Sequence, residues 1–310
     1  MSADLVFALD VGGTYVKGCV VARGEVLEGT VSQYAAGAKD SEEAIIGGLS
    51  DILRDLLEQY KRHPNAETVG VIGIGMSFPG PFDYERGICW IRGLDKFESL
   101  YGVNVKEKLL QSLQASGFGG SPESLDIRFQ NDGRLFGLGA GKKYPDERLL
   151  AITLGTGIGS AFIERGALVT EGDRVPAEGY LYCLPYQGAV ADECFSRRGI
   201  LGLFRDAGCL HDGMDVKELA ELARKGGVRE KELFAKFGEE LGQFLLPFLT
   251  DFKADRLIIG GQIAKSIDLF GEGLHRHLTP SGIRIESLGN ALYHTFIGAS
   301  CLFNSKSLKG

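Results

Sequence analysis

Two apolar stretches joined by a glycine turn, within residues 5–21, restrict the fold of the chain more than any other segment. The first stretch ends in Asp10, and the turn contains Gly12, Gly13 and Thr14. Short apolar runs bounded by such turns are typical of a β-hairpin. Glycine can adopt positive φ angles that turn successive N–H groups toward one point, and it has no Cβ to block an anion. The segment predicts a hairpin whose tip binds phosphate, although an ordinary glycine hairpin closed by a capping aspartate shares the pattern.

Asp10 and Lys17 add charge on either side of this turn. Asp10 stands at the end of the first strand, and Lys17 lies on the returning strand. Mg²⁺ keeps several of its waters and usually binds only one or two carboxylates. We therefore expect Asp10 to hold Mg²⁺ through water, and Lys17 to belong, with the turn, to a site for a phosphorylated cofactor.

The same design returns about half a chain later. Residues 152–163 form an apolar strand, a Gly-Thr-Gly turn and a second apolar strand, as an internal duplication would. Residues 258–266 then end another apolar strand in a glycine pair that opens a helix. Three such segments in this order predict two phosphate-binding hairpins and a flat turn beneath a purine. The candidate residues in the second and third segments are Gly155, Thr156, Gly157, Gly260 and Gly261.

Another predicted strand begins at residue 127. It ends in Asn131 and Asp132 and is followed by a run of small residues. This order places both polar side chains at the N-terminus of a helix. A hydroxyl group is a poor nucleophile until its proton has an acceptor, and a carboxylate within hydrogen-bonding reach supplies one. We interpret Asp132 as a general base and Asn131 as a ligand for a neighbouring hydroxyl; the alternative for Asp132 is a helix N-cap.

Apolar residues at helical spacing predict a helix over residues 40–63, ended by Pro64. Asp40 and Glu43 form a possible capping box at its start. Further helical segments are expected over residues 215–252, with Pro247 kinking or ending one of them, and over residues 291–303.

Length and charge narrow the class of protein. A chain of 310 residues is long enough for two domains with separate cores. A net charge of −7 argues against a protein that binds nucleic acid or an anionic membrane, because it offers no excess of cations for phosphates. No signal peptide or membrane-spanning apolar run is visible, which favours the cytoplasm. The six cysteines lie far apart, as expected of reduced thiols.

Together these segments resemble the ROK family of repressors, open reading frames and sugar kinases, within the actin, Hsp70 and sugar-kinase superfamily. The similarity runs from the first hairpin, through a Pro-Gly-Pro loop within residues 71–83, to residues 297–300. The resemblance implies an α/β fold of two duplicated ribonuclease-H-like domains, of the actin-like ATPase type, around a nucleotide cleft. It implies a first domain of residues 1–130 plus 291–310 and a second of residues 131–290.

The resemblance also implies an ATP-dependent sugar kinase that acts as a homodimer. The γ-phosphate of Mg²⁺–ATP would pass to a hexose hydroxyl, expected to be the 6-OH, with Asp132 as base. A non-catalytic sugar-sensing regulator is the alternative. Family repressors carry an added helix-turn-helix before the first strand, whereas this chain opens directly on that strand, which favours the kinase. The donor is ATP or polyphosphate, and the glycine pair at Gly260 favours a nucleoside.

On the sugar side the resemblance implies one acid at Glu178 and a second at Asp192 or Glu193, although two acids at a solvated helix start would look the same. Tyr180 takes the place of the usual histidine, and Gly93-Leu94 takes the place of the usual Asn-Leu pair. These departures leave the identity of the sugar open. The implied sugar-binding residues are Gly80, Asn131, Asp132, Glu178, Tyr180, Asp192 and Glu193.

Two other features concern the same region. The cysteine-rich zinc motif of the family is missing: Cys183 and Cys194 stand alone, with no histidine between them, so we expect no structural zinc. Trp90, the only tryptophan, either lies in the core or stacks on a sugar face.

Overall fold

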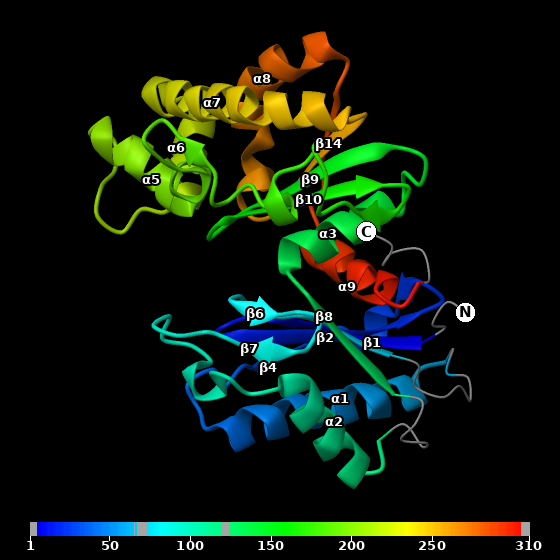
Figure 1. The fold of residues 1–310 in the computed structure, drawn as a ribbon. Helices are drawn as coiled ribbons and strands as arrows, with labels where there is room; N and C mark the ends of the chain where they lie inside the picture. Colours follow the sequence, from blue (N-terminus) through cyan, green and yellow to red (C-terminus); the bar gives the residue numbers. More distant parts are fainter. Residues whose placement is uncertain (1–4, 65, 67–72, 119–124, 305–310) are drawn as a thin grey trace. The chain divides into compact units, whose positions relative to one another are not determined.

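The computed structural model describes residues 5–64, 66, 73–118 and 125–304. The chain forms two compact units, one of residues 1–139 with 292–309 and the other of residues 140–291 (Figure 1). The helix that follows residue 130 lies mostly in the first unit, because it packs there against the last helix. The division of the chain into domains at residues 130 and 291 stays a prediction.

The first unit is built on a mixed sheet in which β1 is central. Its strands run in the order β3-β2-β1-β5-β8, and β4 pairs with the other part of β2. β1 pairs antiparallel with β2, as the predicted hairpin, and parallel with β5, which pairs parallel with β8. The strands are β1 (Leu5–Val11), β2 (Tyr15–Ala22), β3 (Glu25–Val26), β4 (Ser32–Ala35), β5 (Gly73–Ser77) and β8 (Asp126–Gln130).

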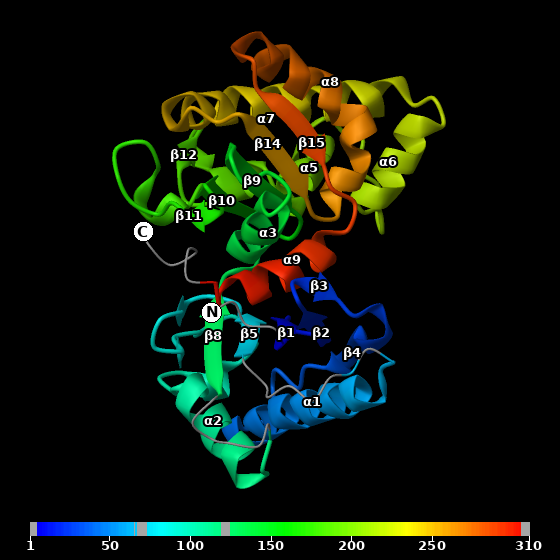
Figure 2. The same ribbon diagram turned by 90° about the vertical axis from the view of Figure 1, so that its right-hand side faces the viewer.

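Helices α1 (Glu42–Arg62) and α2 (Val105–Ala115) cover one face of this sheet, and α9 (Ala291–Cys301) covers the other (Figure 1 and Figure 2). The predicted helix over residues 40–63 is confirmed, but its N-cap is Ser41, whose side chain accepts a hydrogen bond from the Ala44 N–H at 3.3 Å. Asp40 is not the cap, because its own N–H closes a turn onto the carbonyl of Gly37. A small hairpin of β6 (Phe82–Asp83) and β7 (Ile88–Cys89) stands beside the sheet.

The second unit repeats this sheet. Its order is β11-β10-β9-β14-β15, in which β9 pairs antiparallel with β10 and parallel with β14, and β14 pairs parallel with β15. The predicted duplication is therefore confirmed as two sheets of the same order and directions. The strands are β9 (Arg148–Leu154), β10 (Ile158–Glu164), β11 (Ala167–Leu168), β14 (Arg256–Gly260) and β15 (Arg284–Ser287), with a separate hairpin of β12 (Pro185–Tyr186) and β13 (Ala189–Val190).

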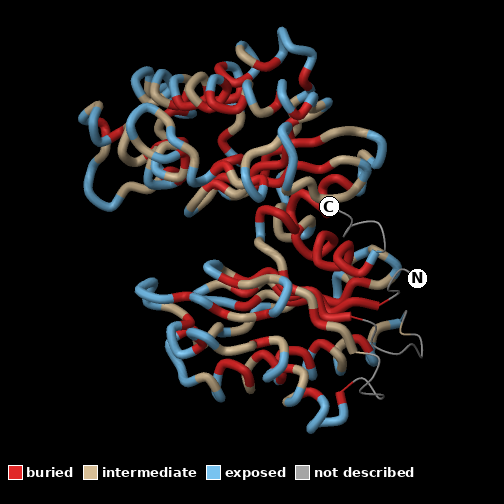
Figure 3. The backbone as a smooth tube through the Cα atoms, viewed as in Figure 1, coloured by how far each residue is buried: buried red, intermediate tan, exposed pale blue. Residues whose placement is uncertain are grey.

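Helices pack on this second sheet and enclose a core rich in phenylalanine (Figure 3). They are α4 (Ala191–Cys194), α5 (Arg197–Asp206), α6 (Val216–Arg224), α7 (Val228–Phe252) and α8 (Ile267–Leu278). Of the two expectations for Pro247, ending the helix is excluded, because α7 continues to Phe252. Pro247 has no N–H to donate to the carbonyl of Gln243, four residues earlier in the helix. Both residues are exposed, so this carbonyl lies on the solvent side of α7.

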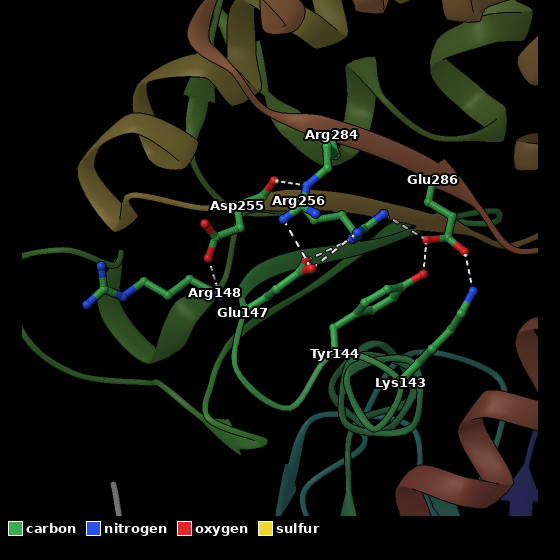
Figure 4. A network of polar contacts seen from close by, with 8 residues as sticks. All are labelled: Lys143, Tyr144, Glu147, Arg148, Asp255, Arg256, Arg284 and Glu286. Carbon is green, nitrogen blue, oxygen red and sulfur yellow. Dashed lines mark hydrogen bonds and ion pairs between the residues drawn. The ribbon is translucent and has the colours of Figure 1, made fainter.

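Arg256 is the centre of a polar network at the start of β14 (Figure 4). Its guanidinium donates to Glu147 at 2.9 Å and to Glu286 at 3.1 Å, and lies 4.0 Å from the ring centre of Tyr144. The Arg256 side chain is only 14% exposed, so these contacts are partly shielded from water. Burial raises the pKa of Glu286, but hydrogen bonds from Tyr144 and Lys143 outweigh it and hold this pKa below its ordinary value. The network ties the loop before β9 to β14 and β15.

Within the first unit, α3 (Asp132–Gly141) and α9 touch through their backbones. A Cβ added at Gly298 would lie 1.8 Å from the carbonyl oxygen of Leu135, and one at Gly139 would lie 1.9 Å from that of His294. Such an approach is possible only for glycine. The contact fixes the axis of α3 and, with it, the place of Asp132 at its first turn.

We expect Gly298→Ala to destabilise the protein by about 1–3 kcal/mol, because the added methyl group must push two helix backbones apart. Gly47→Ala is the matched control: Gly47 is also helical, but an added Cβ there has nothing within 4 Å. That variant should gain about 0.5–1 kcal/mol from helix propensity. Denaturant unfolding of both variants checks this, and an unchanged midpoint for Gly298→Ala would contradict the proposed contact.

Candidate active site

The end of β1 places Asp10 between two polar neighbours in the first unit. In the sheet register Asp10 lies opposite Lys17 of β2 and beside Ser77 of β5. Burial raises the pKa of Asp10, and the negative charge of Asp132 raises it further, against a hydrogen bond from Ser77 and the charge of Lys17. The carboxylate that follows β8 therefore acts electrostatically on the carboxylate near the end of β1.

Asn131 and Asp132 follow β8 directly, as predicted. The Asn131 carbonyl accepts the first helical bond, from the Leu135 N–H at 2.9 Å, so Asn131 is the N-cap residue. The Gly133 N–H lies within hydrogen-bonding distance of both side chains, 3.0 Å from Asn131 Oδ1 and 2.9 Å from Asp132 Oδ1. The side chain of Asp132 is exposed at the first turn of α3. A small molecule can reach it.

The tip of the first hairpin is closed by a hydrogen bond of 2.9 Å from the Gly12 N–H to the carbonyl of Tyr15. The expectation of positive φ at Gly12 and Gly13 is wrong, since neither glycine has such an angle. What these positions provide is space: a Cβ at Gly12 would lie 3.0 Å from the Tyr15 oxygen, and one at Gly13 would lie 3.2 Å from Cδ of Lys96. Thr14 is exposed beside them, and its carbonyl accepts from Ala36.

Lys96 is a residue that the sequence analysis missed. It precedes the buried Phe97 in a loop that carries no motif, so no spacing in the sequence connects it with Gly13. A lysine beside a glycine-rich turn in a non-repeating loop can be recognised only from the folded chain.

The Pro-Gly-Pro loop follows β5 and leaves Gly80 exposed. Tyr84 holds the loop from one side, its hydroxyl donating to the carbonyl of Phe78 at 3.1 Å. Trp90 also contacts the loop, its backbone N–H donating to the carbonyl of Pro81 at 3.0 Å. Trp90 is 45% exposed and its indole meets the Tyr101 ring edge to face at 5.7 Å between ring centres, so the alternative that Trp90 lies in the core is wrong.

In the second unit, Asp192 braces the tip of the hairpin formed by β9 and β10. Its Oδ1 accepts from the Ile158 N–H at 2.9 Å, and its other oxygen pairs with Arg198. The turn is also closed by a bond of 3.0 Å from the Gly155 N–H to the carbonyl of Gly157. Thr156 at the tip is exposed. Glu193, by contrast, is exposed and faces the Val190 N–H at 3.4 Å.

The glycine pair after β14 lies against the same strand end. Gly260 is paired with Thr153 of β9, and Gly261 has a φ of 93°. A Cβ at Gly261 would lie 2.3 Å from the carbonyl oxygen of Leu154. The structure thus brings together, within the second unit, the two glycine segments predicted to bind the nucleotide.

Glu178 and Tyr180 lie on a single 3₁₀ turn, Ala177–Gly179, and the residue after it. Glu178 is exposed and has a φ of 56°, an unfavourable conformation for a side chain other than glycine. Ser160 of β10 anchors the turn, donating to the Gly179 carbonyl at 2.8 Å and accepting from the Leu181 N–H at 3.0 Å. The Tyr180 ring packs on Tyr182 with 5.3 Å between ring centres.

The residues present fit Mg²⁺ at Asp10, because a divalent cation would offset the repulsion from Asp132 that raises the pKa of Asp10, and one or two carboxylates suffice for this ion. In the part of the chain that the structure describes, no group of three or more His, Cys, Asp and Glu side chains could hold a metal ion by itself. Cys183 is exposed and Cys194 half-buried, both as free thiols. The absence of structural zinc stays a prediction.

The duplicated sheet, with a glycine-turn hairpin in each half, defines the actin-like ATPase fold. The chain belongs to the ROK family, whose model matches residues 6–284. Among curated proteins, the glucokinase of Thermotoga maritima is 25% identical over 86% of this chain and 84% of its own length. None of the helices among the described residues is both long and apolar enough to cross a membrane.

Two solved structures show how widely this fold is used. A ROK family glucokinase from Streptomyces griseus, in complex with glucose and AMPPNP, has a TM-score of 0.69 at 18% identity and covers 96% of this chain and 99% of its own. A ROK family transcriptional regulator, a homologue of the E. coli MLC protein, has a TM-score of 0.74 at 14% identity and covers 96% and 78%. The fold alone therefore does not separate a kinase from a regulator.

We expect Asp10→Asn to raise the melting temperature at pH 7 without Mg²⁺. The folded state raises the pKa of Asp10, so ionising this carboxyl costs stability, and that cost appears as the pH rises above the unfolded pKa. The amide removes the cost, and the difference from the parent protein should close below about pH 4, where the parent carboxyl is protonated. Melting curves at several pH values test this. Asp146→Asn, at an exposed residue, is the control; a lower melting temperature for Asp10→Asn at pH 7 would refute it.

We expect Asp192→Ala to loosen the second hairpin, because the Ile158 N–H and Arg198 both lose their acceptor. Hydrogen exchange at residues 155–158 should become about 10-fold faster or more, since a lost hydrogen bond of about 1.5–3 kcal/mol corresponds to such a factor. Glu193→Ala, which removes the neighbouring acid, should leave these amides unchanged. Equal effects of the two variants would show that Asp192 does not brace the turn.

Proposed function

We propose that this protein is a sugar kinase that transfers the γ-phosphoryl group of ATP to the 6-OH of a hexose. The observation that carries the proposal is a pair of carboxylates in the first unit. Exposed Asp132 starts α3 two residues after β8, and the more buried Asp10 of β1 lies beside Ser77, which pairs with Gln130 at the end of β8. An accessible acid beside a turn suited to phosphate is the arrangement that phosphoryl transfer to an alcohol needs. The ROK family match and the glucokinase relative support this choice.

In the proposed step, the hydroxyl oxygen attacks the γ-phosphorus as its proton passes to Asp132. The new oxygen–phosphorus bond forms while the bond from the γ-phosphorus to the bridging oxygen breaks, and ADP leaves with that electron pair. Asp132 keeps its Oδ1 toward the Gly133 N–H at 2.9 Å, which orients the carboxylate before it accepts the proton. Mg²⁺ held by Asp10 through water would neutralise charge on the phosphates when bound.

Each unit has its own share in this proposal. In the first unit, Gly12, Gly13 and Thr14 receive phosphate, and Asn131 and Gly80 contact the sugar. In the second, the turn at Gly155–Gly157 receives phosphate, and Gly260 and Gly261 lie beneath the nucleoside.

The contacts of Asp192 and Glu193 distinguish the two candidates for the second sugar acid. We propose that Asp192 holds the hairpin, because it accepts from the Ile158 N–H and pairs with Arg198, and that the exposed acids Glu178 and Glu193 contact the sugar. We propose Glu178 as the main acid, with Tyr180 beside it in place of a histidine. A cytoplasmic homodimer remains our expectation for the working protein.

The test is an ADP-release assay with Mg²⁺–ATP against a panel of hexoses and N-acetylhexosamines, repeated with polyphosphate as donor. Turnover on a sugar would support the kinase. A protein that is silent across the panel, while sugars still raise its melting temperature, would instead be a sugar-sensing regulator, as the ROK family also contains.

On the active sugar, Asp132→Asn should lower kcat about 10²–10⁴-fold while leaving ATP and sugar affinities nearly unchanged, because only the proton acceptor is lost. Asp126→Asn makes the same chemical change at the far end of β8, where Asp126 pairs with Arg128, and should keep near-native turnover. Near-native turnover of Asp132→Asn would exclude Asp132 as the base.

A further inference from the structure

Lys96 lies over the tip of the first hairpin. Its Cδ would be 3.2 Å, and its Cβ 3.8 Å, from a methyl group added at Gly13, so the aliphatic stem runs along the glycine turn. The ammonium group is two bonds beyond Cδ. The Lys96 stem thus packs beside the glycine turn that we propose binds phosphate, and it carries a positive charge at its end.

The loop that carries Lys96 is firmly held. Phe97 is buried, at 1% exposure, and its ring lies 5.3 Å from that of Phe78, the residue that opens the Pro-Gly-Pro loop. Its N–H donates to the carbonyl of Ala38 at 2.5 Å. Asp95 and Phe97, on either side of Lys96, both have φ of 55°. Two residues in this unfavourable conformation indicate that the position of the intervening side chain is determined by the fold.

The charge of Lys96 is not used within the structure. Over the described residues, no carboxylate pairs with Lys96, whereas the acids around it are occupied: Asp95 pairs with Lys39, and Glu98 accepts from the Asp95 N–H at 2.9 Å. Lys17, the lysine predicted from sequence, lies opposite Asp10 and lowers the pKa of that carboxyl. Within the described residues, Lys96 is therefore a cation beside the glycine turn that is available to a ligand.

We propose that Lys96 binds the terminal phosphoryl group of the donor, the group that is transferred. This inference rests on the proposed function and adds a catalytic residue to it. As the bond to ADP breaks, negative charge builds up on the bridging oxygen that leaves with ADP, and charge stays spread over the three outer oxygens of the transferring group. A fixed ammonium group beside these oxygens favours the transition state more than it favours the ground state. The glycine at position 13 is explained by the same contact, since a side chain there would displace the lysine stem.

The variant Lys96→Met keeps the length of the stem and removes the charge. Lys108→Met is the matched control: it makes the same charge change at a lysine that pairs with Glu42 on α1. Binding of ATP, AMP and inorganic tripolyphosphate is measured by calorimetry with Mg²⁺, together with melting temperatures and, on the active sugar, kcat.

We expect Lys96→Met to weaken binding of ATP and tripolyphosphate about 10-fold, to leave AMP binding unchanged, and to lower kcat about 10²–10³-fold, the usual loss for one donor to a developing oxyanion. Lys96→Arg should recover part of each loss. Lys108→Met should match the parent protein in every measurement.

Three results would overturn the proposal. The first is binding of ATP and tripolyphosphate by Lys96→Met at the level of Lys108→Met, the second is an equal loss for AMP, and the third is a fall in melting temperature that accounts for the whole effect. Failure of the proposed function gives a different result. If the parent protein turns over no sugar, but Lys96→Met still binds tripolyphosphate more weakly than the parent, the lysine site is supported and only the kinase activity is rejected.

Discussion

The first unit depends on a carboxylate that the fold makes costly to ionise. Asp10 ends a strand buried on both sides, and it faces a second acid at the start of α3. Ser77 and Lys17 offset only part of this cost. In the proposed site a cation would offset the negative charge beside the glycine turn, so the stability of the protein and its proposed affinity for a metal would be linked through one side chain.

The duplicated halves have the same sheet but support their hairpins differently. In the first, a backbone hydrogen bond from Gly12 to Tyr15 closes the turn and the Lys96 stem lies beside Gly13; in the second, the side chain of Asp192 from α4 also holds the turn. A brace through a carboxylate fixes the backbone, whereas an unpaired ammonium group leaves a charge available to a ligand. The two halves therefore share one sheet topology, and the side chains around each hairpin differ.

The sequence was informative wherever chemistry is local. Alternating apolar runs and glycine turns predicted both hairpins, and the order strand, Asn131, Asp132, helix appears as expected. What it could not supply were contacts between distant segments. The family resemblance offered Asp192 or Glu193 as a sugar acid, but the bond of Asp192 to the Ile158 N–H joins distant segments and could not be read from the sequence; Lys96 had no motif at all. Trp90 was open to two interpretations because a single aromatic residue carries no periodicity. The φ angles at Gly12 and Gly13 were wrong because glycine was needed for space rather than for a left-handed turn.

The exposed position of Trp90 has a practical consequence. It is the only tryptophan in the chain, it is joined by a hydrogen bond to the loop of Gly80, and its indole already meets water. Fluorescence excited at the red edge of the aromatic band thus comes from one known place beside that loop. A molecule that covers the indole in the native protein would change this emission, which makes the protein its own optical reporter of occupancy at the loop.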